Sequence, residues 1–587
     1  MSFLSTINGP SDLKQLPLEA LPILAEEIRQ ALMFKISRTG GHFGPNFGIV
    51  EATIALHYVF NSPEDKFIFD VSHQCYPHKI LTGRKEAYLN PDLFNEVTGY
   101  TEPKESPHDF FTIGHTSTSV SIACGMAKAR DLQGREENII AIIGDGSMSG
   151  GEAYEGLECA ARLGSNFIVL LNDNQMSIAD VNGGLYPHLR ELRDSKGAAA
   201  NNIFKALGFE YVFVEDGHNT TSLVQAFQAV KDTDHPTLVH ICTTKGKGYA
   251  LAEMNKEDWH WFPPFHEETG EKRRKMSGEN YDDLVGDYLL AKMAEDPAVI
   301  ALAAAVPATI GFNKERRSKA GRQFVDVDIA EEHMLSMAAG LAKNGAKPIV
   351  ATFSTFYQRA YDQIAQDICI NRCPVTMLIR NGSIWAGNDV THLGWFDMAL
   401  FSNIPNLVFL CPTNCEEYFA MLDWSIEQKG HPVAIRIPRN GVHHTQGEVE
   451  HDYSRLNCFK VTQAGSSAAI LALGDFYQLG EELALAVKEK LGFTPTLINP
   501  RYASGVDEAL LNELIGNHQV ALTLEDGILD GGFGQKVASF YGDKPIKVLN
   551  YGLKKEFLDG YNASQVLEAY GITIPNMVDS IRKQLHD

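Results

Sequence analysis

Residues 141–163, AIIGDGSMSGGEAYEGLECAARL, are the stretch from which the fold is inferred. The apolar run 139–143 predicts a buried strand, residues 144–146 form a glycine turn, and a helix is expected to begin near Ser149. A second apolar run, FIVLLN at 167–172, follows this helix. The order strand, helix, strand predicts two neighbouring parallel strands.

The same alternation continues along most of the chain. Residues 237–243, 348–353 and 375–380 are further β-branched apolar runs, and 151–163 and 222–232 have the amphipathic pattern of helices. The sequence therefore predicts an α/β protein with parallel-sheet cores. Two polar stretches, 255–283 and 440–455, interrupt the alternation and have the composition of linkers, which gives three expected domains at 1–270, 280–440 and 455–587.

Composition excludes several classes of protein. The 587 residues include 51 Lys and Arg against 74 Asp and Glu, a formal net charge of −23. A surface so acidic repels phosphate backbones and anionic lipid, so no nucleic-acid or membrane partner is expected. The N-terminus lacks the basic and apolar regions of a leader, and no apolar run is long enough to cross a bilayer, so we expect a cytoplasmic protein.

The nine cysteines do not have the spacing of a zinc site or of a disulfide framework. The pairs Cys369/Cys373 and Cys411/Cys415 are expected to pack as small apolar residues in a reducing compartment.

Polar residues follow both strands of the opening stretch. Asp145 comes directly after the first strand and Asn174 follows the second. Because neighbouring parallel strands end at the same edge of a sheet, these two oxygen ligands are expected to lie side by side. There they could hold a small divalent cation while leaving most of its coordination shell to phosphate oxygens. Glycines beside them let backbone N–H groups approach a diphosphate, although GDG and NDN taken singly are equally typical of ordinary turns.

Asn174 follows Asp145 by 29 positions, which matches a thiamine-diphosphate motif, and other segments agree with it. These segments are GHFGPNFGIVEATIALHYVF (41–60), FDVSHQCYPHKILTGR (69–84), FTIGHTSTSVSIACGMAKAR (111–130), TTKGKGYALAE (243–253), DIAEEHM (328–334), STFYQRAYDQ (354–363) and RIPRNG (436–441). In this order they resemble the 1-deoxy-D-xylulose-5-phosphate synthase family of the transketolase superfamily. The resemblance implies thiamine diphosphate and Mg²⁺ as cofactors, pyruvate and D-glyceraldehyde 3-phosphate as substrates, and a homodimer. It also implies that the three domains bind the diphosphate and metal, bind the pyrimidine, and form a transketolase-like C-terminal domain.

The resemblance assigns roles to individual residues. Glu331 corresponds to the glutamate that activates the cofactor through N1′ of its aminopyrimidine, and the histidines are expected to act on the reacting carbonyls. The predicted catalytic residues are Glu331, His42, His260 and His392. The predicted cofactor-binding residues are His73, Gly114, His115, Thr116, Gly146, Ser147, Asn174, Lys245, Tyr249, Glu331 and Phe356. The predicted metal ligands are Asp145, Asn174 and Met176, and the predicted phosphate-binding residues are Arg359 and Arg439. Taken singly, each of these residue types is also typical of an ordinary core or surface position.

The sequence departs from the family pattern mainly on the substrate side. Residues 179–202 replace a longer insertion, and Phe353 stands where a tyrosine is usual. The segment 380–392, RNGSIWAGNDVTH, alters the usual DRAG…DG.TH pattern. Glu332 replaces a common glutamine, and its charge could raise a neighbouring pKa or form an ion pair. Two alternatives therefore stay open: a related thiamine enzyme that joins pyruvate to another aldehyde or sugar phosphate, and a member that binds the cofactor without turnover.

Overall fold

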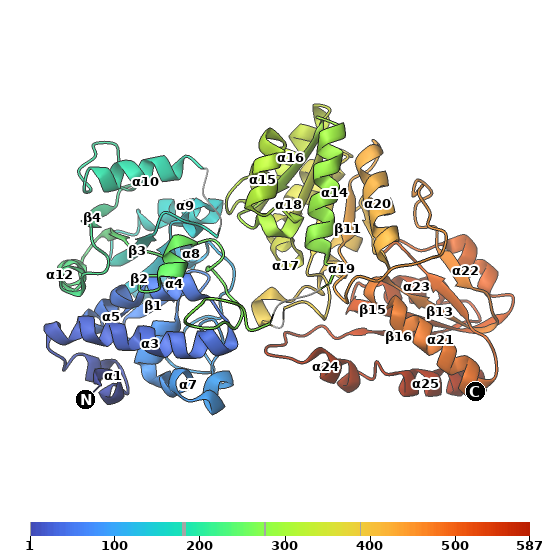
Figure 1. Cartoon of the computed structure of the whole chain (residues 1–587), viewed down its shortest axis with the longest axis horizontal. Helices are drawn as coiled ribbons and strands as arrows, with labels where there is room; N and C mark the ends of the chain where they lie inside the picture. The colour runs from blue at the N-terminus through green and yellow to red at the C-terminus, as the bar shows by residue number, and fades with distance from the viewer. Residues whose placement is uncertain (1, 179–182, 275–277, 388, 587) are drawn as a thin grey trace. The chain divides into compact units, whose positions relative to one another are not determined.

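The computed structural model describes residues 2–178, 183–274, 278–387 and 389–586 of the chain. Two compact units form, one from Met1–Ser277 with Asp328–Ala330 and the other from Gly278–Val327 with Glu331–Asp587. The first contains one sheet and the second contains two, all covered by helices (Figure 1). The predicted α/β class with parallel-sheet cores is confirmed.

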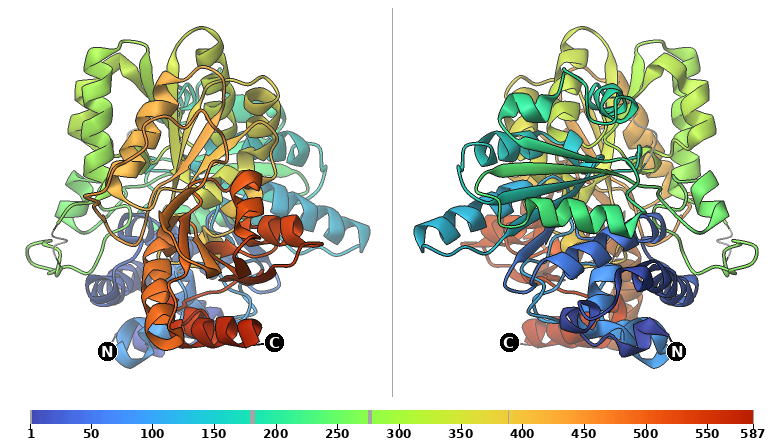
Figure 2. Two further views of the ribbon diagram at one scale, coloured as in Figure 1. Left: turned by 90° about the vertical axis from the view of Figure 1, so that its right-hand side faces the viewer. Right: turned by 90° about the vertical axis from the view of Figure 1, so that its left-hand side faces the viewer.

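The sheet of the first unit has five parallel strands in the order β1-β2-β3-β5-β4. The strands are β1 (Lys66–Phe69), β2 (Ile139–Gly144), β3 (Phe167–Asp173), β4 (Glu210–Val214) and β5 (Pro236–Cys242). One face of the sheet shares its core with helices α3 (Leu21–Thr39), α5 (Val50–Val59) and α12 (Thr220–Val230). The other face shares its core with α8 (Ser119–Leu132), α9 (Gly151–Ala160), α10 (Leu185–Asp194) and α11 (Ile203–Leu207). Figure 2 shows these strands with helices on both sides. A sheet covered on both faces explains why its strands are almost continuously apolar.

The second unit begins with a six-stranded parallel sheet in the order β10-β11-β9-β8-β6-β7. Its strands are β6 (Val299–Ala303), β7 (Phe324–Asp326), β8 (Lys347–Phe353), β9 (Thr376–Arg380), β10 (Val408–Leu410) and β11 (Val433–Arg436). One face packs against α14 (Tyr281–Glu295), α15 (Lys314–Ala320) and α20 (Cys415–Glu427), and the other against α16 (Glu331–Lys343), α17 (Ser354–Tyr357) and α19 (Asp397–Ser402).

The third sheet has the order β12-β14-β13-β15-β16. Its strands are β12 (Lys460–Gln463), β13 (Ser467–Ala472), β14 (Thr496–Asn499), β15 (His518–Ile528) and β16 (Lys547–Leu553). Helices α21 (Tyr477–Leu491), α24 (Ala563–Ala569) and α25 (Ile574–His586) contribute to one core, and α22 (Glu508–Leu514) and α23 (Phe533–Tyr541) to the other. Strand β12 runs antiparallel to β14. This sheet therefore differs from the expectation of a wholly parallel sheet. The strand is short, largely polar and at the sheet edge, where an antiparallel addition is common.

Short α-helices lie between these elements, along with several 3₁₀ and π turns. These α-helices are α1 (Phe3–Thr6), α2 (Pro10–Leu13), α4 (Phe43–Gly48), α6 (Tyr76–Lys79), α7 (Glu86–Leu89), α13 (Ala250–Met254) and α18 (Tyr361–Gln363). Several longer helices begin with the expected capping chemistry: Asn219, Asn280 and Asn414 each accept a hydrogen bond from a backbone N–H in the first turn.

Two local predictions need correction. The helix expected from near Ser149 starts at Gly151, because Ser147–Ser149 forms a separate 3₁₀ turn. The stretch 255–283 is not a linker throughout: Trp259, Phe262 and Phe265 are buried in the core of the first unit. Aromatic residues spaced among charged ones were enough to anchor a segment whose average composition is polar.

All nine cysteines are free, and Cys369, Cys373, Cys411 and Cys415 are buried, as expected of small apolar residues. Among the described helices, none combines the length and apolar character that a bilayer crossing needs.

Candidate active site

The first group of predicted residues lies at the carboxyl edge of the first sheet. Strands β2 and β3 are direct parallel neighbours, so Asp145 and Asn174 follow adjacent strand ends as the sequence predicts. The Asp145 carboxylate accepts backbone hydrogen bonds from Gly146 (3.0 Å) and Met176 (3.1 Å), and only 1% of Asp145 is exposed. Burial raises the pKa of Asp145 well above its ordinary value, and the neighbouring Asp173 raises it further.

This edge fits a small cation. The buried Oδ1 atom of Asn174 has no hydrogen-bond partner among the described residues. An unpaired amide oxygen beside a buried carboxylate is costly unless a ligand satisfies both, and Mg²⁺ prefers such oxygens. At Gly146, a Cβ atom would lie 3.1 Å from the Cα and Oγ atoms of Ser177, so a side chain there would crowd the turn. The donor set therefore suits a metal-bound diphosphate.

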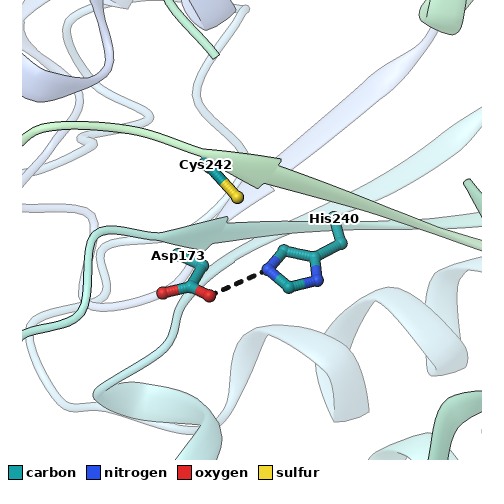
Figure 3. A group of neighbouring side chains, drawn as sticks. All are labelled: Asp173, His240 and Cys242. Carbon is teal, nitrogen blue, oxygen red and sulfur yellow. Dashed lines mark hydrogen bonds and ion pairs between the residues drawn. The ribbon is translucent and has the colours of Figure 1, made fainter. Parts of the chain in front are cut away.

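A carboxylate next to this pair has a different environment. Asp173, the last residue of β3, forms an ion pair with Arg193 and lies 2.9 Å from Nε2 of His240. Figure 3 shows Asp173 facing His240 of the neighbouring strand β5, with Cys242 farther along that strand. Burial raises the pKa of the Cys242 thiol to about 12, so the thiol stays protonated and is a poor metal ligand. Because Arg193 and His240 already satisfy Asp173, this group holds β3, β5 and α10 together.

Lys245 follows β5 at the same edge. Its side chain is buried, and Nζ donates to the carbonyl of Ser177 at 2.8 Å. Burial lowers the pKa of Lys245 to about 7, although Asp145 opposes the change. A nearby anion would favour the charged form of this lysine.

The segment that contains Gly114, His115 and Thr116 is fixed by a buried carboxylate. Asp70, directly after β1, accepts hydrogen bonds from the backbone N–H groups of Ser117 (2.8 Å) and Ser119 (3.0 Å). Oγ of Ser117 donates to the carbonyl of Ser147 at 2.8 Å, which joins this segment to the turn after Asp145. Two predicted cofactor-binding segments are thus connected. The sequence analysis did not identify Asp70, although it lies in the quoted segment 69–84.

Three of the predicted histidines gather in the first unit. The ring centroids of His42, His73 and His260 are 5.1–5.7 Å apart. Asn46 donates through Nδ2 to the carbonyls of His42 and His73, both at 2.7 Å, and so fixes their backbones. Burial lowers the pKa of His260 well below its ordinary value, which favours the neutral imidazole. Asn46 is a further positioning residue that spacing alone could not reveal.

Tyr249 lies in an aromatic cluster. Its ring is 5.3 Å from that of Phe43 and 5.1 Å from that of Trp259, and its hydroxyl donates to the carbonyl of Glu267 at 2.9 Å. The structure therefore gives this side chain a packing role, and its contact with a cofactor stays a prediction.

Glu331 is the first residue of α16 in the second unit. It is 6% exposed, and its buried Oε2 atom has no hydrogen-bond partner among the described residues. Burial raises the pKa of Glu331 to about 7, even though the Arg359 guanidinium, 3.8 Å away, opposes the shift. A carboxyl oxygen at a helix start that has an ion pair but no hydrogen bond fits a hydrogen bond to a ring nitrogen such as N1′.

Arg359 and Arg439 have different surroundings. Arg359 lies beside Glu331, whereas the backbone N–H of Arg439 donates to both oxygens of Asp475 (2.9 and 3.2 Å). Convergence of the two guanidiniums on one phosphate stays a prediction.

Phe356 and His392 come together in the second unit. Their ring centroids are 5.5 Å apart, and Phe353 packs against Phe356 at 5.3 Å. Nδ1 of His392 lies 3.0 Å from Oδ1 of Asp389, which favours a proton on Nδ1. Residues 179–182 and 388, which belong to two of the departures from the family pattern, lie outside the described residues.

Family models cover almost the whole chain. A model described as 1-deoxy-D-xylulose-5-phosphate synthase matches residues 4–200, and one described as the transketolase thiamine diphosphate binding domain matches 115–287. The transketolase pyrimidine binding domain matches 278–444 and the transketolase C-terminal domain 459–577.

Curated relatives give the same result over the full length. A 1-deoxy-D-xylulose-5-phosphate synthase of Alkaliphilus oremlandii is 39% identical over 100% of this chain and 99% of its own length. The chain belongs to the 1-deoxy-D-xylulose-5-phosphate synthase family. Two other curated synthases are also similar. That of Caldanaerobacter subterraneus is 36% identical, and the match covers 98% of each chain. That of Symbiobacterium thermophilum is 37% identical, and the match covers 97% of this chain and 93% of the relative. The resemblance, the enzyme class and thiamine diphosphate as cofactor are confirmed for this synthase-family chain, while its residue assignments stay predictions.

Proposed function

We propose that this chain condenses pyruvate with D-glyceraldehyde 3-phosphate to give 1-deoxy-D-xylulose 5-phosphate and CO₂, using thiamine diphosphate and Mg²⁺. The observation that supports this most directly is relatedness to 1-deoxy-D-xylulose-5-phosphate synthases over the full length. The buried carboxyl oxygen of Glu331, which has no hydrogen-bond partner among the described residues, adds chemical support. The homodimer remains part of the proposal.

The residues of the first unit bind and neutralise the cofactor's diphosphate. Asp145, Asn174 and Met176 would hold Mg²⁺, and Lys245 would supply a positive charge once an anion is near. When bound, thiamine diphosphate supplies an electron sink for decarboxylation of a 2-oxo acid. The segment of Gly114–Thr116, held by Asp70 and joined to Ser147, would complete the diphosphate cradle.

Glu331 and the predicted catalytic histidines would transfer protons. A carboxyl group with a pKa of about 7 is partly protonated at neutral pH, so Glu331 can both give and take a proton. The neutral imidazole that burial favours at His260 can accept a proton from a substrate hydroxyl or donate one to an oxyanion, and His42, whose ring centroid lies 5.7 Å from that of His260, would take part in the same transfers. His392 is oriented for the same work by Asp389, which leaves Nε2 as the acceptor.

Product identification tests the function. Purified protein with thiamine diphosphate and Mg²⁺ is incubated with ¹³C-pyruvate and D-glyceraldehyde 3-phosphate, while NMR follows the product and a coupled assay follows CO₂. We expect 1-deoxy-D-xylulose 5-phosphate from the wild type and none from Glu331→Gln, with a thiamine diphosphate titration showing whether the variant still binds the cofactor. Absence of CO₂ release by the folded, cofactor-loaded wild type would refute the proposal.

A second candidate keeps the chemistry but changes the acceptor. Phe353, at the end of β8, packs on Phe356 and offers no hydroxyl where the family has tyrosine. A panel of aldehydes and sugar phosphates distinguishes the two candidates: kcat/KM highest for D-glyceraldehyde 3-phosphate supports the first, and a better acceptor supports the second.

A further inference from the structure

The ligand loop, residues 173–176, carries two of the predicted metal ligands and is closed by local hydrogen bonds. Asp173 is the last residue of β3, and its Oδ1 atom accepts the backbone N–H of Gln175 at 3.1 Å. Gln175 has a φ of 64°, a left-handed conformation that is uncommon outside glycine. The backbone N–H of Met176 donates to Oδ2 of Asp145 at 3.1 Å. Asn174 therefore lies in a turn whose shape depends on the carboxylate directly before it.

The Asp173 carboxylate is itself held by groups from other elements. Its Oδ2 atom forms an ion pair with Nη1 of Arg193, which lies in the last turn of α10. The same oxygen lies 2.9 Å from Nε2 of His240 on the neighbouring strand β5 (Figure 3). The hydroxyl of Tyr211 on β4 lies 2.7 Å from Nδ1 of that histidine. Strands β4 and β5 and helix α10 therefore fix the orientation of the carboxylate that shapes the ligand loop.

Arg193 supplies the positive charge that this buried carboxylate needs. The side chains of Asp173 and His240 are fully buried, and that of Arg193 is 14% exposed. A neutral imidazole can donate one hydrogen bond to Asp173 but adds no charge. Removing the cation from a buried ion pair leaves the other charge uncompensated, and the chain around it is then expected to rearrange. Loss of Arg193 should therefore disturb the ligand loop, although Arg193 does not belong to it.

Arg193 comes from the part of the sequence that replaces a longer insertion of the family pattern, residues 179–202. Its helix, α10, is anchored on the first sheet because Tyr186, Leu189 and Leu192 are buried in the core that the helix shares with the strands. Arg193 follows Leu189 by four positions and therefore lies on the same side of the helix. The shortened segment thus keeps a fixed connection to the ligand loop.

We infer that Arg193 is a positioning residue for the metal: through Asp173 it holds the ligand loop in the shape that keeps Oδ1 of Asn174 available to the cation. The inference rests on the proposed function, which places Mg²⁺ and thiamine diphosphate at this edge of the sheet. The Oδ1 atom of Asn174 is buried and has no hydrogen-bond partner among the described residues, so its direction depends on the loop. Contacts behind metal ligands fix the direction of the ligand atom, and their removal commonly weakens metal binding by about 10- to 100-fold.

The test compares variants of two arginines on the same helix. Mn²⁺ is titrated into the wild type, Arg193→Met, Arg193→Lys and Arg190→Met with thiamine diphosphate present, and electron paramagnetic resonance measures the free and the bound metal. Arg190 is the matched control because it is an exposed arginine of α10. We expect Arg193→Met to weaken Mn²⁺ binding at least about fivefold and Arg190→Met to change it less than about twofold. Lysine should restore part of the loss, since it keeps the charge but not the planar fork.

A double variant separates positioning from a general loss of stability. If Arg193 acts through Asn174, then Arg193→Met should weaken Mn²⁺ binding less than about twofold in the Asn174→Ala background. Arg193→Lys serves in this comparison if Arg193→Met does not fold. Equal losses in both backgrounds, or an Arg193→Met protein that binds Mn²⁺ as tightly as the wild type, would overturn the inference.

The binding assay keeps the inference separate from the proposed function, because it needs no turnover. A wild type that binds Mn²⁺ and thiamine diphosphate but makes no 1-deoxy-D-xylulose 5-phosphate would contradict the proposed function alone. In that case a weaker Mn²⁺ affinity of Arg193→Met, without a change in Arg190→Met, still supports the positioning role.

Discussion

The buried carboxyl group of Glu331 is expected to destabilise the cofactor-free protein as pH rises. The pKa of Glu331 increases from 4.5 to about 7 on folding. Below pH 4.5 both the folded and the unfolded chain hold the proton, and the group has no effect. Between pH 4.5 and 7 only the unfolded chain releases it, so folding stability falls, and above pH 7 the full penalty applies. At about 1.36 kcal/mol per pKa unit, the penalty is about 0.8 kcal/mol at pH 5.0 and about 3.4 kcal/mol at pH 8.5.

Replacing Glu331 by Gln keeps the shape and removes the charge. Urea unfolding of the cofactor-free wild type and Glu331→Gln at pH 5.0 and 8.5 should show the variant gaining about 2–3 kcal/mol relative to wild type between the two pH values. Glu332→Gln, at the half-buried next position, is the control and should stay within about 0.5 kcal/mol of wild type at both. A stability difference for Glu331→Gln that does not change with pH, or a wild type that is the more stable protein at pH 8.5, would refute the reasoning.

Two further substitutions test the metal site and the core. Asn174→Ala removes the unpaired amide oxygen and should weaken Mn²⁺ binding at least about tenfold. Mn²⁺ affinity is measured by electron paramagnetic resonance with thiamine diphosphate present. An unchanged affinity would show that Asn174 is not a metal ligand. Arg436→Met leaves the buried carboxylates of Asp397 and Asp526 without their shared cation. Denaturant titrations should show a loss of about 3–5 kcal/mol in the free energy of unfolding. A loss below about 1 kcal/mol would mean that the two carboxyl groups are neutral in the folded protein.

Much of the fold could be predicted because its strands are buried on both faces. The run 167–172 became β3, and the runs near 237, 348 and 375 became β5, β8 and β9, with no end shifted by more than one residue. Such strands are recognisable from their own residues. Strand β12 was missed because it is polar and its direction depends on a partner, β14, more than thirty residues away.

The site was predictable where topology alone decides it. Asp145 and Asn174 follow neighbouring parallel strands, so their proximity follows from strand order. The gathering of His42, His73 and His260 depends on loops that no spacing rule describes, and only the family resemblance suggested it. Two other contacts could not be predicted from spacing either. They are the hydrogen bonds from Asn46 to the carbonyls of His42 and His73, and the ion pair between Asp173 and Arg193.

The departures from the family pattern are connected in space as well as in sequence. Phe353 and Arg380 are register partners at the ends of β8 and β9, although 26 positions separate them in the chain. The missing tyrosine hydroxyl and the altered beginning of the segment 380–392 therefore change the same edge of the second sheet. The lost hydroxyl could give one hydrogen bond, whereas a guanidinium offers five donors and a full positive charge. The edge therefore loses a neutral hydroxyl but keeps a cation, Arg380, and so stays suited to an anionic ligand such as a phosphorylated acceptor.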